Sequence, residues 1–262
     1  MSSPPDPEEI FDRAAEEGDR RLRQPALELL STSFIAGFTV VFGIVALGIV
    51  HAAVEPALGE LATVAGPLAF APSLVFLVVG RTELFNENFF DPVAAAFDAD
   101  DTWLIGPLVR LWTATLAFNF AGAVALAAFV AVEGAIPPAA AAALVTTAET
   151  VAGRQPAAAF GSAVIGGALV ALLSFLLQAV DTAGARISLS FMVGFLLALG
   201  PFHHVVVTVV HVYVGMLFGG NVGYATLAEI LAVSTAGNLV GGLGLVTLSH
   251  VTQAVGARSL GD

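Results

Sequence analysis

Six apolar stretches dominate this 262-residue sequence, and each is long enough to cross a membrane. A transmembrane helix needs about 20 consecutive apolar residues. The composition agrees, because 57% of the residues are hydrophobic and only 11% are charged, too few to cover the surface of a soluble domain. We therefore predict an all-α membrane protein with six transmembrane helices. The stretches cover residues 31–53, 66–97, 103–132, 157–180, 188–218 and 224–252.

Six spans place both termini on one side of the membrane, and the arginines indicate which side. Six arginines lie before the first span, between spans four and five, or after the last span, whereas Arg154 lies in the opposite set of loops. The positive-inside rule then predicts a multi-pass plasma-membrane protein with both termini in the cytoplasm. The expected parts are an acidic, arginine-containing segment (residues 1–30), a six-span domain (31–252) and a tail (253–262).

Composition also excludes several classes of function. The formal net charge is −12 and the nine basic residues form no patch, so we expect no nucleic acid partner. The chain has no cysteine and no GxSxG or HExxH motif, so we expect no enzyme activity, no cofactor and no metal site. All nine basic residues are arginine, and the acidic excess at the chain's water-exposed ends suggests a halophile.

Two segments outside the spans carry enough apolar residues to suggest helices. Ile10, Phe11, Ala14 and Leu22 form a weak apolar stripe, which fits either a helix on the inner membrane face or a solvated charged tail. Residues 137–150 are too short to cross, so we expect an external, half-buried helix there.

Spans two and five are each too long for one helix and are broken in the middle. The first break reads GRTELFNEN (residues 80–88) and the second GPFHH (residues 200–204), where Pro201 removes a backbone donor. Irregular backbone at membrane depth is tolerated only where protein buries it or a wet cavity meets it. The two breaks therefore predict a transport pathway.

A faint repeat relates the two halves of the chain. Gly80 and Asn119 are 39 residues apart, and Gly200 and Asn238 are 38 apart. Each half holds three spans, so the halves must enter the membrane from opposite sides, as in the inverted repeats of many transporters. We predict an inverted 3+3 arrangement with Asn119 and Asn238 as its structural motif.

Charged residues at the first break need an explanation, because an ionised group at a helix centre costs about 2.5 to 3.5 kcal/mol on insertion. The residues concerned, inside or beside the break, are Arg81, Glu83, Glu87 and Asp91. In one interpretation Arg81 pairs with Glu83 or Glu87 and closes the loop. In the other, Arg81 faces the pathway and attracts anions.

Span five carries three histidines, His203, His204 and His211. On a helix, His204, Thr208 and His211 would share one face. Three interpretations compete: a pore histidine that exchanges protons or hydrogen bonds with a permeant, a metal site, and a packed histidine bonded to its neighbours.

At the two breaks the sequence resembles the formate/nitrite transporters, a family of pentamers whose protomers have six spans and an aquaporin-like fold. The resemblance covers the transmembrane region and rests on the loop at 80–88, which is similar to the family's Gly-x-x-[Asp/Glu]-Leu-Phe-Thr. It also rests on Phe202 and His204, and on Asn119 and Asn238 with the glycines that follow them. It implies a homo-pentamer in membrane lipid whose substrate is a small monovalent weak-acid anion.

The resemblance also implies roles for individual residues. His204 would be the central pore histidine with Leu84 beside it, while Phe70 and Leu74 would form apolar constrictions and Leu197 would replace a constriction Phe. The family's loop Thr is Asn86 here, the Glu before its histidine is His203, the Asn four residues after it is Thr208, and a fourth-span Asn is Ala168. The predicted substrate pathway comprises Phe70, Leu74, Leu84, Asn86, Leu197, Phe202, His204 and Thr208.

These residues suggest a mechanism. The anion would take a proton or a strong hydrogen bond from His204 and cross the apolar constrictions, with Asn86 and Thr208 orienting the imidazole. Protons would then be a second partner. The alternative is a passive channel for a small neutral solute such as water or ammonia, which should be indifferent to a proton gradient.

Overall fold

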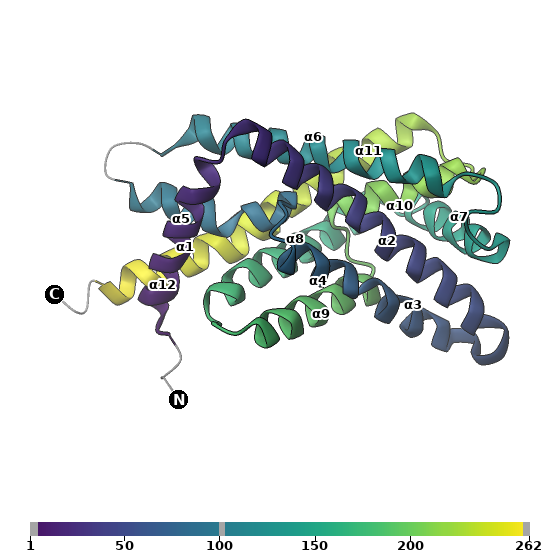
Figure 1. The fold of residues 1–262 in the computed structure, drawn as a ribbon, viewed down its shortest axis with the longest axis horizontal. Helices are drawn as coiled ribbons and strands as arrows, with labels where there is room; N and C mark the ends of the chain where they lie inside the picture. Colours follow the sequence, from purple (N-terminus) through teal and green to yellow (C-terminus); the bar gives the residue numbers. More distant parts are fainter. Residues whose placement is uncertain (1–4, 100–102, 259–262) are drawn as a thin grey trace.

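The computed structural model describes residues 5–99 and 103–258, and all regular structure in these ranges is helical. The helices form an elongated bundle, with α1, α5, α12 and both termini at one end and α7 at the other (Figure 1). The elements are α1 (Pro7–Leu22), α2 (Ala26–Leu58), η1 (Gly59–Leu61), α3 (Ala62–Phe70), α4 (Pro72–Val79), η2 (Phe85–Asn88), α5 (Phe90–Asp98), α6 (Ile105–Val130), α7 (Pro138–Ala152), α8 (Pro156–Gln178), α9 (Ala183–Leu199), α10 (Val205–Leu217), α11 (Tyr224–Leu239), η3 (Val240–Thr247) and α12 (Leu248–Arg258).

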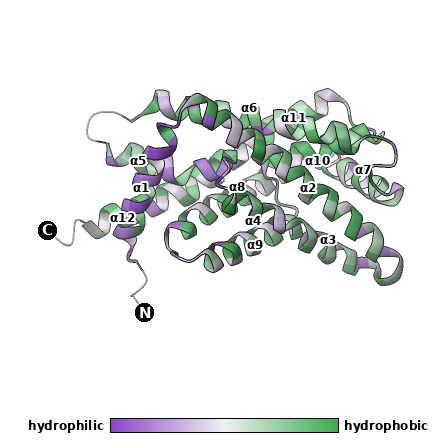
Figure 2. Ribbon diagram, viewed as in Figure 1, coloured by the Kyte–Doolittle hydropathy of each residue, from purple (hydrophilic) through white to green (hydrophobic). Residues whose placement is uncertain are grey.

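The outer surface of the bundle is apolar, as a lipid-facing surface must be. Phe42, Phe76 and Phe129 are 53%, 59% and 71% exposed. Figure 2 shows hydrophobic residues along most helices, whereas the hydrophilic residues gather on α1 and at the helix ends. Within the described residues, four helical runs are long and apolar enough to cross a membrane: Ala26–Val79, Ile105–Val130, Pro156–Gln178 and Tyr224–Ala257. The predicted fold class, an all-α membrane protein, is confirmed.

Both predicted breaks are present. Span two consists of α3 and α4, then an irregular segment with η2, then α5, and span five consists of α9 and α10 separated at residues 200–204. Several span boundaries differ: α9 begins at Ala183 instead of 188, and α2 continues to Leu58 instead of ending at 53. The chain then turns at Gly59, whose φ of 53° favours glycine. The polar residues near Glu55 end the apolar stretch but do not end the helix.

The first half of the chain is held together by close packing between α2 and α6. A Cβ on Gly37 would lie 1.8 Å from the carbonyl oxygen of Asn119, and one on Gly122 would lie 1.9 Å from that of Phe34. Only glycine permits two backbones to approach so closely in a membrane. These contacts fix the crossing of spans one and three.

The second half repeats these contacts between α8 and the last span. A Cβ on Gly167 would lie 2.5 Å from the Asn238 carbonyl oxygen, and one on Gly241 would lie 1.9 Å from that of Val164. Gly37 and Gly167 therefore play the same part, as do Gly122 and Gly241. The predicted inverted repeat is confirmed at the level of single contacts. One feature breaks the symmetry, since the last span winds as a π-helix, η3, over a run rich in glycine.

The apolar stripe of α1 packs on protein, which neither expectation from the sequence anticipated. Ile10, Phe11 and Ala14 are buried. Phe11 and Ala14 share a cluster with Phe90 of α5 and Val251 of α12. The helix therefore covers one end of the bundle, as Figure 1 shows. At the other end, α7 forms the helix expected at 137–150, half-buried through Ala140, Leu144 and Ala148.

Candidate functional site

Asn238 holds the second break in place. Its side-chain nitrogen donates to the carbonyl oxygens of Ala163 and His203, both at 2.7 Å. Its side-chain oxygen accepts from the backbone N–H of Val205, also at 2.7 Å. One buried amide thus satisfies the polar backbone groups that the broken helix leaves free.

Asn119 holds the first break in the same way. Its nitrogen donates to the carbonyl oxygens of Ser33 and Glu83 at 2.8 and 2.9 Å, and its oxygen accepts from the N–H of Phe85 at 3.0 Å. Glu83 and Phe85 therefore correspond to His203 and Val205. The residues between them, Leu84 and His204, occupy equivalent positions at the centres of the two breaks.

His204 is fully buried and has one free ring nitrogen. It caps the start of α10, where Nδ1 accepts a hydrogen bond of 3.3 Å from the N–H of Val207. Its Nε2 has no partner among the described residues. A buried polar atom without a partner is rare and calls for a bound group or a function. This atom is where a permeant could form a hydrogen bond.

The expected orienting role of Asn86 is not what the structure shows. Its side-chain nitrogen donates to the Asn238 side chain at 2.8 Å, so the two amides join the first break to the second. The imidazole is oriented by the N–H of Val207 instead. The Thr208 backbone N–H donates to the His204 carbonyl at 2.8 Å, which is the first hydrogen bond of α10 and does not contact the ring. His204 precedes α10, so the expected helical face begins only with Thr208 and His211, both buried.

Most apolar residues of the predicted pathway are buried, and Phe202 is half-buried. Phe70, Leu74 and Leu84 belong to the main hydrophobic core. Leu197 is buried near the end of α9, and the ring of Phe202 covers Gly200. These side chains form the apolar part of the site.

His203 lies in a different environment from His204. It lines a cavity of about 40 Å³ with Arg154 and Ser234. Neither ring nitrogen of His203 has a partner among the described residues. Arg154 donates to the Pro201 carbonyl at 3.0 Å. His203 and His204 are adjacent in the sequence, but their side chains lie in different environments.

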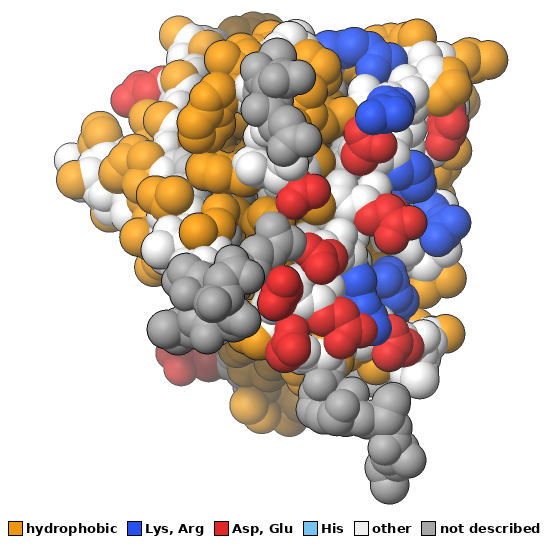
Figure 3. All heavy atoms as spheres, turned by 90° about the vertical axis from the view of Figure 1, so that its left-hand side faces the viewer, with side chains coloured by type: hydrophobic (Ala, Val, Ile, Leu, Met, Phe, Trp, Pro, Cys, Tyr) orange, Lys and Arg blue, Asp and Glu red, His pale blue; other side chains and the backbone are white. Residues whose placement is uncertain are grey.

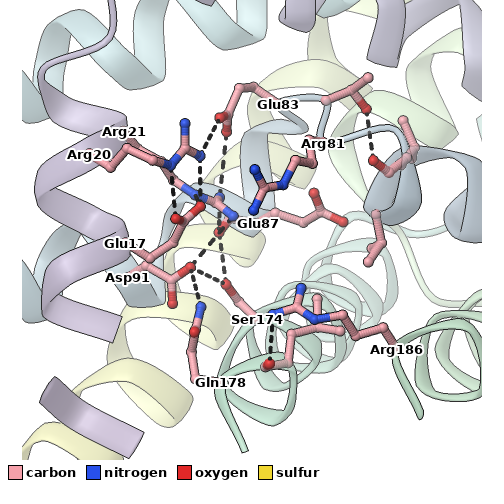
Figure 4. Close-up of a pocket in the computed structure, with 14 residues that line it drawn as sticks. Glu17, Arg20, Arg21, Arg81, Glu83, Glu87, Asp91, Ser174, Gln178 and Arg186 are labelled. Carbon is pink, nitrogen blue, oxygen red and sulfur yellow. Dashed lines mark hydrogen bonds and ion pairs between the residues drawn. The ribbon is translucent and has the colours of Figure 1, made fainter. Parts of the chain in front are cut away.

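Glu83 of the first break pairs with α1, not with Arg81 as one interpretation predicted, whereas the Glu87 carboxylate has no arginine within 4 Å among the described residues. Arg21 lies 3.5 Å from Glu83, 3.5 Å from Asp91 and 3.1 Å from Glu17 (Figure 4). In the described parts of the chain, no carboxylate oxygen lies within 4 Å of the Arg81 guanidinium group. Sequence reasoning missed Arg21 because it lies far away along the chain. Its place beside Leu22, on the buried stripe of α1, was the available signal.

Ion pairs within α1 shift the pKa of Glu17. Burial alone would raise the pKa of Glu17, but hydrogen bonds from Arg20 and the charge of Arg21 outweigh it and lower that pKa to about 2. Arginine, aspartate and glutamate side chains gather on this end of the molecule (Figure 3). The Glu17 carboxylate therefore stays ionised at any physiological pH.

Comparison with known proteins adds the decisive observation. The family description "Formate/nitrite transporter" matches residues 8–252, which is almost the whole chain. The chain belongs to the formate/nitrite transporter family. A curated relative of this family member, "Inner membrane protein YfdC" of Escherichia coli (strain K12), is 25% identical over 245 residues, which cover 93% of this chain and 77% of that protein.

Solved structures share the fold of this formate/nitrite transporter homologue. An "FNT family ion channel" matches with a TM-score of 0.81 at 16% identity, over 92% of this chain and 97% of the other. A "Pentameric formate channel with formate bound" matches with a TM-score of 0.67 at 17% identity, over 83% and 92% of the two chains. The aquaporin-like fold implied by the sequence is confirmed.

Proposed function

We propose that this family member conducts small monovalent weak-acid anions, such as formate or nitrite, across the plasma membrane. The observation that carries the proposal is the buried His204, whose Nε2 has no partner among the described residues and which occupies the position in its break that Leu84 occupies in the other. Family membership and the fold shared with a formate channel support it. The proposed assembly is a homo-pentamer in lipid with both termini in the cytoplasm.

Proton transfer lowers the free-energy cost of moving an anion through an apolar site. A charged carboxylate loses several kcal/mol of hydration on entering an apolar region, whereas its neutral acid loses far less. In the proposed step, His204 takes up a proton from the water on the entry side, which breaks the Nδ1 hydrogen bond with the Val207 N–H. The ring then passes its Nε2 proton to the anion's oxygen, which leaves a neutral acid and a neutral imidazole. The acid then moves past Leu84, Phe70 and Leu74 and releases the proton into water on the far side.

The test is uptake of labelled formate and nitrite into proteoliposomes with and without an inward proton gradient. We expect the gradient to increase uptake, and His204→Ala to reduce uptake by about 100-fold or more, as expected for loss of a general acid. His51→Ala is the matched control, because His51 lies near the end of α2 and outside the site. Gradient-independent anion uptake, or full uptake by His204→Ala, would contradict the proton-linked mechanism.

One observation favours a second function, a passive channel for water or ammonia. Because Nδ1 of His204 accepts from Val207, the neutral ring carries its proton on Nε2 and can donate to a neutral solute without changing charge. Stopped-flow water and ammonia permeability of the same proteoliposomes separates the two functions. Rapid solute flux with no anion flux would favour this alternative.

A further inference from the structure

Arg81 occupies a backbone position that normally belongs to glycine. The N–H groups of Arg81 and Thr82 donate to the carbonyls of Val78 and Leu77, which closes the C-terminal end of α4. In this capping motif the residue after the cap is left-handed and is usually glycine. Arg81 adopts a φ of 52° there, although glycine stands one position earlier, at Gly80. The chain thus keeps an arginine side chain where the backbone disfavours one.

The side chain of Arg81 lines a cavity between α1 and the first break (Figure 4). This inner cavity has a volume of about 90 Å³ and is also lined by Arg186, from the start of α9. It adjoins a wider opening of about 500 Å³, and Arg186 lines both. Arg81 and Arg186 therefore lie where a solute would enter the molecule from the end covered by α1.

The arginines around these two cavities fall into two groups. Arg13, Arg20 and Arg21 each have a carboxylate oxygen within 3.1 Å. Arg81 and Arg186 have none within 4 Å in the chain as far as it is described. Arg186 donates instead to the Leu177 carbonyl at 3.1 Å, which leaves its positive charge uncompensated.

The carboxylates of the inner cavity are mostly neutralised by α1. Glu17, Glu83 and Asp91 lie within 4 Å of Arg20 or Arg21. The remaining one, Glu87, has no arginine that close among the described residues. The cavity is lined by four arginines and four carboxylates, so it has no overall positive field. An anion would be held there by direct hydrogen bonds from the two uncompensated guanidinium groups.

We propose that Arg81 and Arg186 form an anion-binding site at the inner mouth, which takes a small planar oxyanion, a carboxylate or nitrite. A guanidinium group offers paired N–H donors whose spacing matches such oxygens. Binding at this site would give the anion hydrogen-bond donors before it reaches the apolar part of the pathway. The identity of the anion rests on the proposed function, whereas the site itself rests on the two arginines and the cavity.

Binding is tested first without transport. Purified protein is heated in detergent with increasing sodium formate or sodium nitrite, balanced by sodium chloride to constant ionic strength. We expect saturable stabilisation of the native protein, a dissociation constant about tenfold higher for Arg81→Gly and for Arg186→Gln, and a tighter one for Glu87→Gln. Arg23→Gln is the control, because Arg23 pairs with Asp19 and lines neither cavity.

Replacing Arg81 with glycine distinguishes an effect on anion affinity from an effect on protein stability. Arg81→Gly relieves the left-handed strain, so the ligand-free variant should unfold at the same temperature as the native protein or higher. A purely structural role for Arg81 predicts the reverse, a less stable variant with unchanged anion affinity. Unchanged affinity in both Arg81→Gly and Arg186→Gln would overturn the proposal.

Current measurements in a planar bilayer, with anion added to one side at a time, then show at which end of the pathway the site lies. Anion added on the α1 side should show a half-saturation concentration about tenfold higher in Arg81→Gly, with no change from the other side. An equal change from both sides, or none, would contradict an inner site. If the native protein carries no anion current at all, the proposed function fails, and the binding measurement alone decides on the site.

Discussion

At the scale of single residues, two asparagines determine whether the broken helices can exist. Each amide bonds two backbone groups of a break and one carbonyl of a neighbouring helix, Asn119 at the first break and Asn238 at the second. Asn238 also accepts from Asn86 and so connects the breaks. The positions of Leu84 and His204 follow from these contacts, because each lies between two backbone groups that an asparagine holds.

Asn238→Ala should therefore destabilise the protein strongly. It leaves the His203 carbonyl, the Val205 N–H and the side-chain nitrogen of Asn86 without their partner, and each buried unpaired group costs about 1 to 3 kcal/mol. We expect a loss of about 3 kcal/mol or more, measured as a lower midpoint of thermal unfolding in detergent. Asn221→Ala, at an exposed position, should leave the midpoint unchanged. Equal midpoints for the two variants would contradict the role given to Asn238.

At the scale of elements, glycines set how closely the paired helices pack, and charges set where α1 docks. The crossing of α2 and α6 leaves no space for a side chain at Gly37. The docking of α1 instead depends on the ion pairs of Arg21 with Glu83 and Asp91. The bundle is thus held by packing in its apolar middle and by charge at its polar end.

Gly37→Ala should force α2 and α6 apart. Its Cβ would meet backbone, which cannot move aside as a flexible side chain can, so we expect a cost near 3 kcal/mol, the upper end for overpacking. Gly161→Ala in α8 has open space around it and should be neutral or slightly stabilising. Thermal unfolding of both variants in one detergent checks this. A Gly37→Ala protein as stable as Gly161→Ala would show that the helices can separate freely.

At the scale of the whole molecule, the apolar outer surface must be covered by lipid or by other copies of the chain. Exposed phenylalanines lie on α2, α4 and α6, on several sides of the bundle. Glycine-rich helices and family membership favour a symmetric assembly in the membrane. The pathway proposed here lies within one protomer, between its own two breaks.

Native mass spectrometry from a mild detergent should therefore give the mass of five chains. Each protomer should keep its own pathway, so mixed pentamers of native and His204→Ala chains should lose anion flux in proportion to the variant fraction. A single variant chain that abolishes all flux would contradict independent pathways. A monomer as the only species would contradict the assembly.

The sequence by itself determined the six spans, the two breaks and the repeat. Apolar length and helix-breaking residues such as Pro201 act locally, so they can be identified along the chain. Only the tertiary structure decided which polar groups meet. It paired Glu83 with Arg21 instead of Arg81 and joined Asn86 to Asn238. It also placed His203, but not His204, at a cavity lined by Arg154. Interacting partners lie far apart in the sequence, and the two adjacent histidines differ only in their surroundings. Because charge and hydrogen bonding act through space, no local sequence pattern encodes these contacts.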